Sequence, residues 1–152
     1  MTVPNFVTLE QVRAELADVA SYAAAAGLGL DASMLSEANP LFYLTFSNRD
    51  DIEFVAEFDC RDYPLNPPMI EFVDAAHTRR ATPNLYPSCF HPLPCVCARY
   101  NRKAYKTLGG PHDDWRLIDW QLPTQAGPKI DSLAMIVSDM HSKIASSTGR
   151  MG

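Results

Sequence analysis

Apolar residues recur at two different periods along the 152-residue chain, and each period predicts a different kind of element. Near the N-terminus they follow the spacing of one helix face, at Leu9, Val12, Leu16, Val19, Ala20 and Ala23. This spacing predicts a helix over about 8–26. Thr8 and Gln11 have the spacing of a capping box at its start. Gly27 and Gly29 follow as residues that end helices.

The period then shortens to two, which is typical of strands with one buried face. Apolar and polar residues alternate over 42–46 and 52–58, and 69–73 is a third strand candidate. A polar turn at 47–51 joins the first two runs, and a proline-rich loop precedes the third. Strands that follow one another in this way predict an antiparallel meander.

Periodicity fades between about 74 and 128, which is a long stretch for a compact domain. Its large aromatic residues need burial, so we expect an ordered cover over the sheet: Phe90, Tyr100, Tyr105, Trp115 and Trp120. Long irregular segments of this kind are usually functional or disordered, and the aromatic residues argue against disorder. This segment also holds Cys89, Cys95 and Cys97.

A second amphipathic helix follows the irregular segment, with one apolar face made by Ile130, Leu133, Ala134, Val137, Met140 and Ile144. Pro128 suits its first turn. Asp131 and Lys143 carry the charges that favour the two ends of the helix dipole. Residues 146–152 are expected to form a frayed tail.

Length and charge narrow the class of protein. One compact α+β domain over 1–152, with its core at about 8–145, accounts for the whole chain. Thirteen Lys and Arg against eighteen Asp and Glu give a net charge of −5, which disfavours nucleic acid as a partner. No apolar run approaches the roughly 20 residues of a membrane span. We therefore expect a cytoplasmic protein that binds neither nucleic acid nor a membrane.

The four cysteines do not form an obvious disulfide or metal framework. A cytosolic domain of this length needs no disulfide, and a single residue separates Cys95 from Cys97. Cys60 and Cys89 are expected to be small buried residues. Cys89, Cys95 and Cys97 with His91 are possible zinc ligands, but their spacing lacks the usual Cys-x-x-Cys pairs. We therefore expect no metal and no cofactor.

A motif at the proline loop says more about the family of the protein than the composition, charge or cysteine spacing does. It reads Tyr63-Pro64-x-x-Pro67-Pro68-x-Ile70-x-Phe72 and follows an alternating strand. The prolines stiffen the crossover between two strands, and the Tyr63 ring can pack beneath it. This pattern resembles the signature of the ubiquitin-conjugating enzymes. The resemblance covers about 8–145 and is tight over 52–72. It implies that fold: an N-terminal helix, an antiparallel meander, an irregular active-site segment and a C-terminal helix.

The resemblance also implies an activity. Enzymes of this family carry a ubiquitin-like protein as a cysteine thioester, from an adenylating activating enzyme to a target amine. The active cysteine of the family follows a hydrophobic residue, so Val96-Cys97 fits better than Pro94-Cys95. Cys97 is therefore the expected acceptor and Cys95 the alternative. Asn84 of Thr82-Pro83-Asn84 stands where the family has an Asn that supports the active-site loop, although the usual preceding His is absent.

An inserted region after Cys97 makes the chain look more like divergent bacterial members, which are encoded beside ubiquitin-like proteins and adenylating enzymes. It spans 98–105 and 109–115. Three basic residues in and near it are candidates to favour the Cys97 thiolate, namely Arg99, Arg102 and Lys103. Asn84 or Asn101 are candidate donors to an oxyanion. Candidates to orient the attacking lysine are His112, Asp113 and Asp114.

Two other classes compete with this interpretation. A catalytically inactive binding module for a ubiquitin-like protein would keep the same proline loop. A papain-like cysteine hydrolase would also use Cys, His and Asn. Such hydrolases set the nucleophile at the start of a long helix, whereas Cys97 follows prolines and precedes no apolar stripe.

Overall fold

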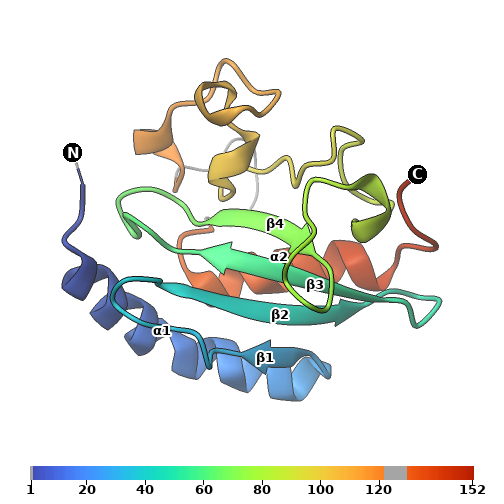
Figure 1. Cartoon of the computed structure of the whole chain (residues 1–152), viewed down its shortest axis with the longest axis horizontal. Coiled ribbons are helices and arrows are strands. Elements are labelled where there is room, and N and C mark those ends of the chain that lie inside the picture. Colours follow the sequence, from blue (N-terminus) through green and yellow to red (C-terminus); the bar gives the residue numbers. More distant parts are fainter. Residues whose placement is uncertain (1, 122–129) are drawn as a thin grey trace.

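The computed structural model describes residues 2–121 and 130–152 as an α+β arrangement (Figure 1). Its helices and strands, in chain order, are α1 (Asn5–Ala26), β1 (Gly29–Asp31), β2 (Leu41–Ser47), β3 (Glu53–Asp59), β4 (Met69–Val73) and α2 (Leu133–Ala145). Between β4 and α2 the described chain forms short 3-10 turns, η1 (Pro83–Leu85), η2 (Arg102–Ala104), η3 (Lys106–Leu108) and η4 (Leu117–Asp119). The predicted α+β class is confirmed.

The strands form one antiparallel sheet in the order β1-β2-β3-β4. The register places Phe42 opposite Phe58, and Ala56 opposite Phe72, so these apolar residues share a face. The predicted meander is thus confirmed for β2, β3 and β4. The sequence missed β1, because three residues are too short to show an alternating pattern and Gly29 was assigned to the end of the helix.

The core lies between the sheet and the two helices, which also contact each other. In Figure 1, α2 passes behind the sheet while α1 runs along its β1 side. Fully buried side chains from both layers meet there, among them Val12, Val19, Phe42, Leu44, Phe46, Phe58, Ile136, Val137 and Met140. Phe42 and Phe58 stack with ring centroids 4.9 Å apart. Burial of each such side chain stabilises the fold by about 2 kcal/mol.

The start of α1 differs from the prediction. The helix begins at Asn5 after Pro4, whose carbonyl accepts hydrogen bonds from the amides of Val7 (3.0 Å) and Thr8 (3.1 Å). The prediction of a capping box is wrong, because the Thr8 hydroxyl instead donates to the carbonyl of Tyr63 (3.0 Å). The predicted end is confirmed, since Gly27 caps the helix with a φ of 74°.

One carboxylate joins α1, the proline loop and α2. Glu15 Oε1 accepts hydrogen bonds from the Tyr63 hydroxyl (2.8 Å) and from the amide of Leu133 (2.8 Å). The Ser132 side chain accepts from the amide of Met135 (3.2 Å) and so caps α2. The predicted second helix is confirmed with Leu133, Val137, Met140 and Ile144 on its buried face. It begins later than predicted, so Ile130 and Asp131 precede it, and Pro128 lies outside the described residues.

The predicted frayed tail is wrong. The amide of Arg49 donates to the Ser147 carbonyl (3.0 Å), and Asn48 Nδ2 donates to the Gly149 carbonyl (2.8 Å). The amide of Met151 donates to the Tyr86 carbonyl (3.0 Å), and the Met151 side chain is only 7% exposed. The C-terminal segment is therefore packed between the β2–β3 turn and the segment that follows η1.

The outer edge of β4 is covered by side chains. Asn101 Oδ1 accepts a hydrogen bond from the amide of Ile70 (2.9 Å), and the Tyr86 hydroxyl bonds the backbone of Phe72. The amide of Arg102 donates to the Pro68 carbonyl (3.0 Å) just before the strand. An uncovered edge would expose backbone groups that pair readily with other chains. These contacts also fix the cysteine segment against the sheet.

Candidate functional site

The segment before the cysteine pair is a tight hairpin. His91 and Cys95 exchange two backbone hydrogen bonds, both 3.0 Å long. The residues between them are Pro92, Leu93 and Pro94, and proline fixes φ at two of these three positions. Leu93 lies at the tip with its side chain 61% exposed. The hairpin therefore holds Cys95 at its base with little backbone freedom.

Val96 anchors the cysteine pair in the core. Its side chain is 1% exposed, and its carbonyl accepts hydrogen bonds from the Ala98 amide (3.0 Å) and from Asn101 Nδ2 (2.9 Å). Cys95 is 3% exposed and Cys97 is partly exposed. The two thiols are hydrogen-bonded to each other. They therefore face the same side of the segment, with Cys97 nearer to solvent.

Asn101 holds this segment in place. It is fully buried, and its Oδ1 accepts from the amides of Ile70 (2.9 Å) and Lys103 (3.1 Å), while its Nδ2 donates to Val96. Three backbone groups thus depend on one side chain. The prediction that Asn101 donates to an oxyanion is wrong, because its amide is buried and bonded to the backbone.

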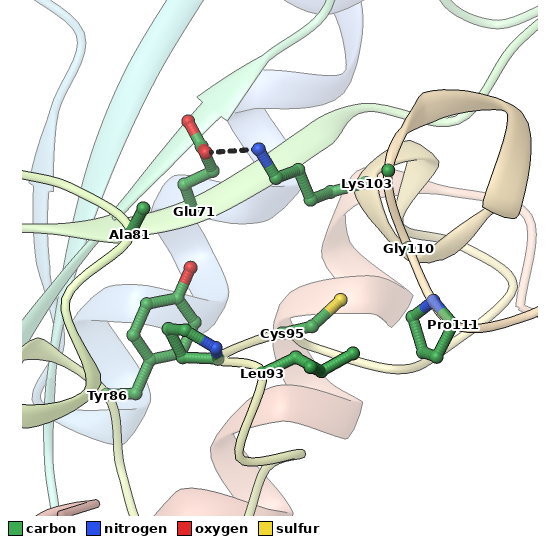
Figure 2. A pocket seen from close by; sticks show the side chains of 10 residues that line it. Glu71, Ala81, Tyr86, Leu93, Cys95, Lys103, Gly110 and Pro111 are labelled. Carbon is green, nitrogen blue, oxygen red and sulfur yellow. Dashed lines mark ion pairs between the residues drawn. The ribbon is translucent and has the colours of Figure 1, made fainter.

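A small pocket of about 80 Å³ opens beside Cys95. Its walls come from β4, from the hairpin, from η2 and from the loop after η3, and they include Glu71, Tyr86, Leu93, Pro94, Cys95, Lys103, Gly110 and Pro111. Figure 2 shows the Cys95 sulfur between Leu93, Lys103 and Pro111. Gly110 has no room for a side chain, because a Cβ there would collide with the backbone of Ala104. This close approach shapes the pocket wall.

An ion-pair chain crosses the outer face of the sheet and ends at the pocket. Lys103 Nζ lies 3.0 Å from Glu71, and Arg80 bridges Glu71 (2.9 Å) and Glu57 (2.7 Å). Burial raises the pKa of Glu57, but hydrogen bonds from Arg80 and Tyr43 outweigh it and leave the pKa below its ordinary value. The two glutamates are each 8% exposed, so their negative charges are balanced by Arg80 and Lys103 and only slightly by solvent.

The two thiols differ in acidity. Burial, followed by the charge and hydrogen bond of Cys97, raises the pKa of Cys95 to about 12, despite the nearby Lys103 ammonium. Burial also raises the pKa of Cys97, whereas a hydrogen bond from the Cys95 thiol lowers it. Since Cys97 is the more exposed of the two, burial opposes the loss of its proton less than it does for Cys95.

The basic residues near Cys97 do not activate it, so that prediction is wrong. Arg99 lies over the ring of Trp115 at 5.5 Å, and Arg102 donates to the carbonyl of Arg61 (3.0 Å). Lys103 faces Cys95 and lowers the pKa of that thiol, not of Cys97. The raised pKa of Cys97 means that the thiol is protonated at neutral pH.

His112 and its neighbours have local roles. The His112 ring stacks on Trp115 with centroids 3.6 Å apart, and its backbone bonds Lys106 and Ala104. Asp113 and Asp114 are exposed. The roles of these three residues at a substrate amine stay a prediction.

Asn84 lies in η1, where its side chain is exposed and its carbonyl accepts from Arg150 (3.1 Å). Among the contacts of residues 2–121 and 130–152, none joins Asn84 to Cys97. The role that the resemblance assigns to Asn84 stays a prediction.

The other two cysteines behave differently from each other. Cys60 is fully buried, as predicted. Cys89 is exposed, so the prediction of a buried thiol is wrong there. Within the described parts of the chain, no group of three metal-ligating side chains is placed to hold an ion.

The hydrogen bond between Cys95 and Cys97 is the feature that sequence reasoning missed. The Cys-Val-Cys spacing could have indicated it, because a buried valine in an extended segment leaves the side chains of both neighbouring residues on the opposite side of that segment.

Comparison with known proteins adds no relative: no family model, curated protein or solved structure matches the chain. Among the described helices, none has the length and apolar character needed to cross a membrane.

Proposed function

We propose that the protein is a conjugating enzyme for a ubiquitin-like protein, with Cys97 as the residue that carries the modifier as a thioester. The observation that carries this proposal is the asymmetry of the cysteine pair. Cys97 is partly exposed and its thiolate accepts a hydrogen bond, whereas Cys95 is buried and holds its proton more tightly. A large acyl donor needs an accessible sulfur, which favours Cys97.

The proposed reaction needs no strong acid or base among the surrounding groups. The Cys97 thiolate attacks the thioester carbonyl carbon of the loaded activating enzyme, a new C–S bond forms, and the thiolate of the donor leaves. Exchange between two thioesters is nearly isoenergetic, so a positioned thiolate suffices. A neutral target amine then attacks the carbonyl carbon of the Cys97 thioester, an amide bond forms, the Cys97 sulfur leaves as a thiolate, and the proton lost by the nitrogen passes to that thiolate directly or through water. In this proposal the Cys95 thiol donates to the Cys97 thiolate before the first step and after the second, which is supported by their interaction in the free protein.

The proline loop supports the proposed ubiquitin-conjugating fold. Tyr63 is fully buried beneath the loop, its hydroxyl reaches Glu15 of α1, and Trp120 Nε1 donates to the carbonyl of Pro64 (3.1 Å). Leu65 at the loop tip is 36% exposed. The loop is thus a rigid projection tied to α1 on one side and to the segment after Cys97 on the other.

We further propose that the partners are a ubiquitin-like protein, its adenylating enzyme and a target amine, and that the protein works in the cytoplasm. The four cysteines are free thiols, which suits a reducing compartment.

Reconstitution tests the proposal directly. The chain is incubated with ATP and with ubiquitin-like proteins, each paired with its own activating enzyme, and adducts are separated with and without reductant. We expect an adduct that reductant releases, that is lost in Cys97→Ala and that persists in Cys95→Ala. Loss in Cys95→Ala alone would transfer the role to Cys95.

A non-catalytic binding module is the second candidate, and the raised pKa values of both thiols favour it. The binding-module hypothesis replaces the conjugating-enzyme hypothesis if the wild-type chain binds a ubiquitin-like protein in solution but forms no adduct with the activating system. Binding by Cys97→Ala as tight as that of the wild type would then show that the thiol is not needed.

A further inference from the structure

We infer that Cys95 and Cys97 form a reversible disulfide with each other when a small disulfide such as oxidised glutathione is present, and that Cys95 is the resolving thiol. The inference concerns regulation of the proposed site: it rests on the proposed function for its biological meaning, but its chemistry does not require that function.

The backbone brings the two sulfurs within reach. Two successive residues span at most about 7 Å, so the Cα atoms of Cys95 and Cys97 lie near the separations that disulfides adopt. Val96 is held in the core and points away from the thiols, which are already hydrogen-bonded to each other. Bond formation therefore starts from two neighbouring thiols and proceeds by rotation of their side chains.

The pocket gives Cys95 the freedom that this rotation needs. Its sulfur lies between Leu93, Lys103 and Pro111 and borders an open volume of about 80 Å³. A buried cysteine in a fully packed site would lose favourable contacts when its sulfur moved. Because the Cys95 sulfur borders the pocket, its rotation toward Cys97 breaks fewer packing contacts than it would in a fully packed site.

The two thiols have different access to reagents. Cys97 is partly exposed and meets an external disulfide first, whereas Cys95 is 3% exposed. A tripeptide such as glutathione is too large for the pocket beside Cys95. Cys95 therefore reacts with its neighbour, whose fixed position gives it a high effective concentration.

The reaction balances in two exchange steps. The Cys97 thiol loses its proton and attacks oxidised glutathione; a Cys97–glutathione disulfide forms and one glutathione leaves and takes up a proton. The Cys95 thiol then loses its proton and attacks the Cys97 sulfur; the Cys95–Cys97 bond forms and the second glutathione leaves. Two protein thiols are oxidised and one glutathione disulfide is reduced.

The experiment uses the full chain with Cys89→Ser as background, which removes the exposed competing thiol. The protein is incubated with oxidised glutathione at pH 8.5, quenched with acid, and measured by intact mass without reductant. We expect the loss of two hydrogen atoms, with two fewer free thiols after denaturation. Reductant should restore the original mass.

Two further substitutions identify the roles. Cys95→Ser should stop at the first step and keep one bound glutathione on Cys97. Cys97→Ser should neither gain glutathione nor lose two thiols, because Cys95 is buried. A persistent glutathione adduct with Cys95 intact, thiol loss in Cys97→Ser, or no reaction at all would each overturn the inference.

The outcome is separable from the proposed function, since the mass measurement needs no activating enzyme. If thioester loading exists, prior treatment with oxidised glutathione should abolish it, and reduction followed by removal of the reductant should restore it. If loading does not exist, the disulfide is still expected to form.

Discussion

At the scale of single residues, the proposed function depends on which of two neighbouring thiols, Cys95 or Cys97, loses its proton more readily. The flanking residues in the sequence favoured Cys97 over Cys95, but they carried no information on acidity. The order of ionisation depends on how far each sulfur is removed from water and on the hydrogen bond between them. The burial of each sulfur has no sequence signal, and the Cys-Val-Cys spacing indicates only that the two thiols can lie on the same side of the segment. This is also why the basic residues after Cys97 were wrongly expected to activate it.

The raised pKa of Cys97 makes a kinetic prediction. The ordinary thiol value is 9.0, and a thiol reacts with iodoacetamide as its thiolate. In the Cys89→Ser background we expect the alkylation rate of Cys97 to keep rising beyond pH 9.0, where the rate of an ordinary exposed thiol begins to level off. The measurement is intact mass over time across a pH series. A plateau below pH 8 would contradict the assigned direction.

The Cys95 hydrogen bond makes a second prediction for the same thiol. Removal of the donor in Cys95→Ala should raise the pKa of Cys97 further and slow its alkylation at pH 8 by about two- to tenfold, since one pKa unit is a tenfold change in thiolate. Cys95→Ser keeps a hydroxyl donor and serves as the matched control. It should restore most of the rate, whereas equal rates in all three proteins would exclude the hydrogen bond.

At the scale of elements, the strongly periodic segments were predictable and their ends were not. The two helices and β2 to β4 follow from the spacing of their apolar residues. The true start of α1 depends on Pro4 and on a distant carbonyl that occupies the Thr8 hydroxyl, and β1 depends on pairing with β2. These contacts join residues far apart in the chain, so local patterns could not show them. The fold of the irregular segment was unpredictable for the same reason.

Asn101 allows a test at this scale, because it links β4, the cysteine segment and η2. Asn101→Leu keeps the branched shape but removes the partner of the Ile70 and Lys103 amides, while the Val96 carbonyl keeps its bond from Ala98. At about 1–3 kcal/mol for each of the two unpaired amides, we expect a loss of about 2–6 kcal/mol in the free energy of unfolding. Urea titration measures it.

Asn84→Leu is the matched control for Asn101→Leu. The Asn84 side chain is exposed, so the substitution should change the free energy of unfolding by no more than about 0.5 kcal/mol. If the two variants were equally stable, Asn101 would not be the residue that holds the segment.

At the scale of the whole molecule, the C-terminal segment is part of the fold. Met151 is 7% exposed and belongs to the core, and its amide bonds Tyr86. Met151→Ala should therefore reduce the free energy of unfolding by about 2 kcal/mol. Met34→Ala is the control, since that side chain is 60% exposed and should change little. Thermal unfolding of both variants decides whether the segment contributes to stability.

The way in which the β4 edge is covered determines where the chain near the cysteines can change in length. A strand paired along this edge would impose the repeat of the sheet on every residue that follows. Asn101 and Tyr86 instead fasten the neighbouring segment at two isolated points. Between these points lies the His91–Cys95 hairpin, which has its own pairing, so a change of length at its tip, in 92–94, would alter the rim of the site and leave the register of the sheet unaltered.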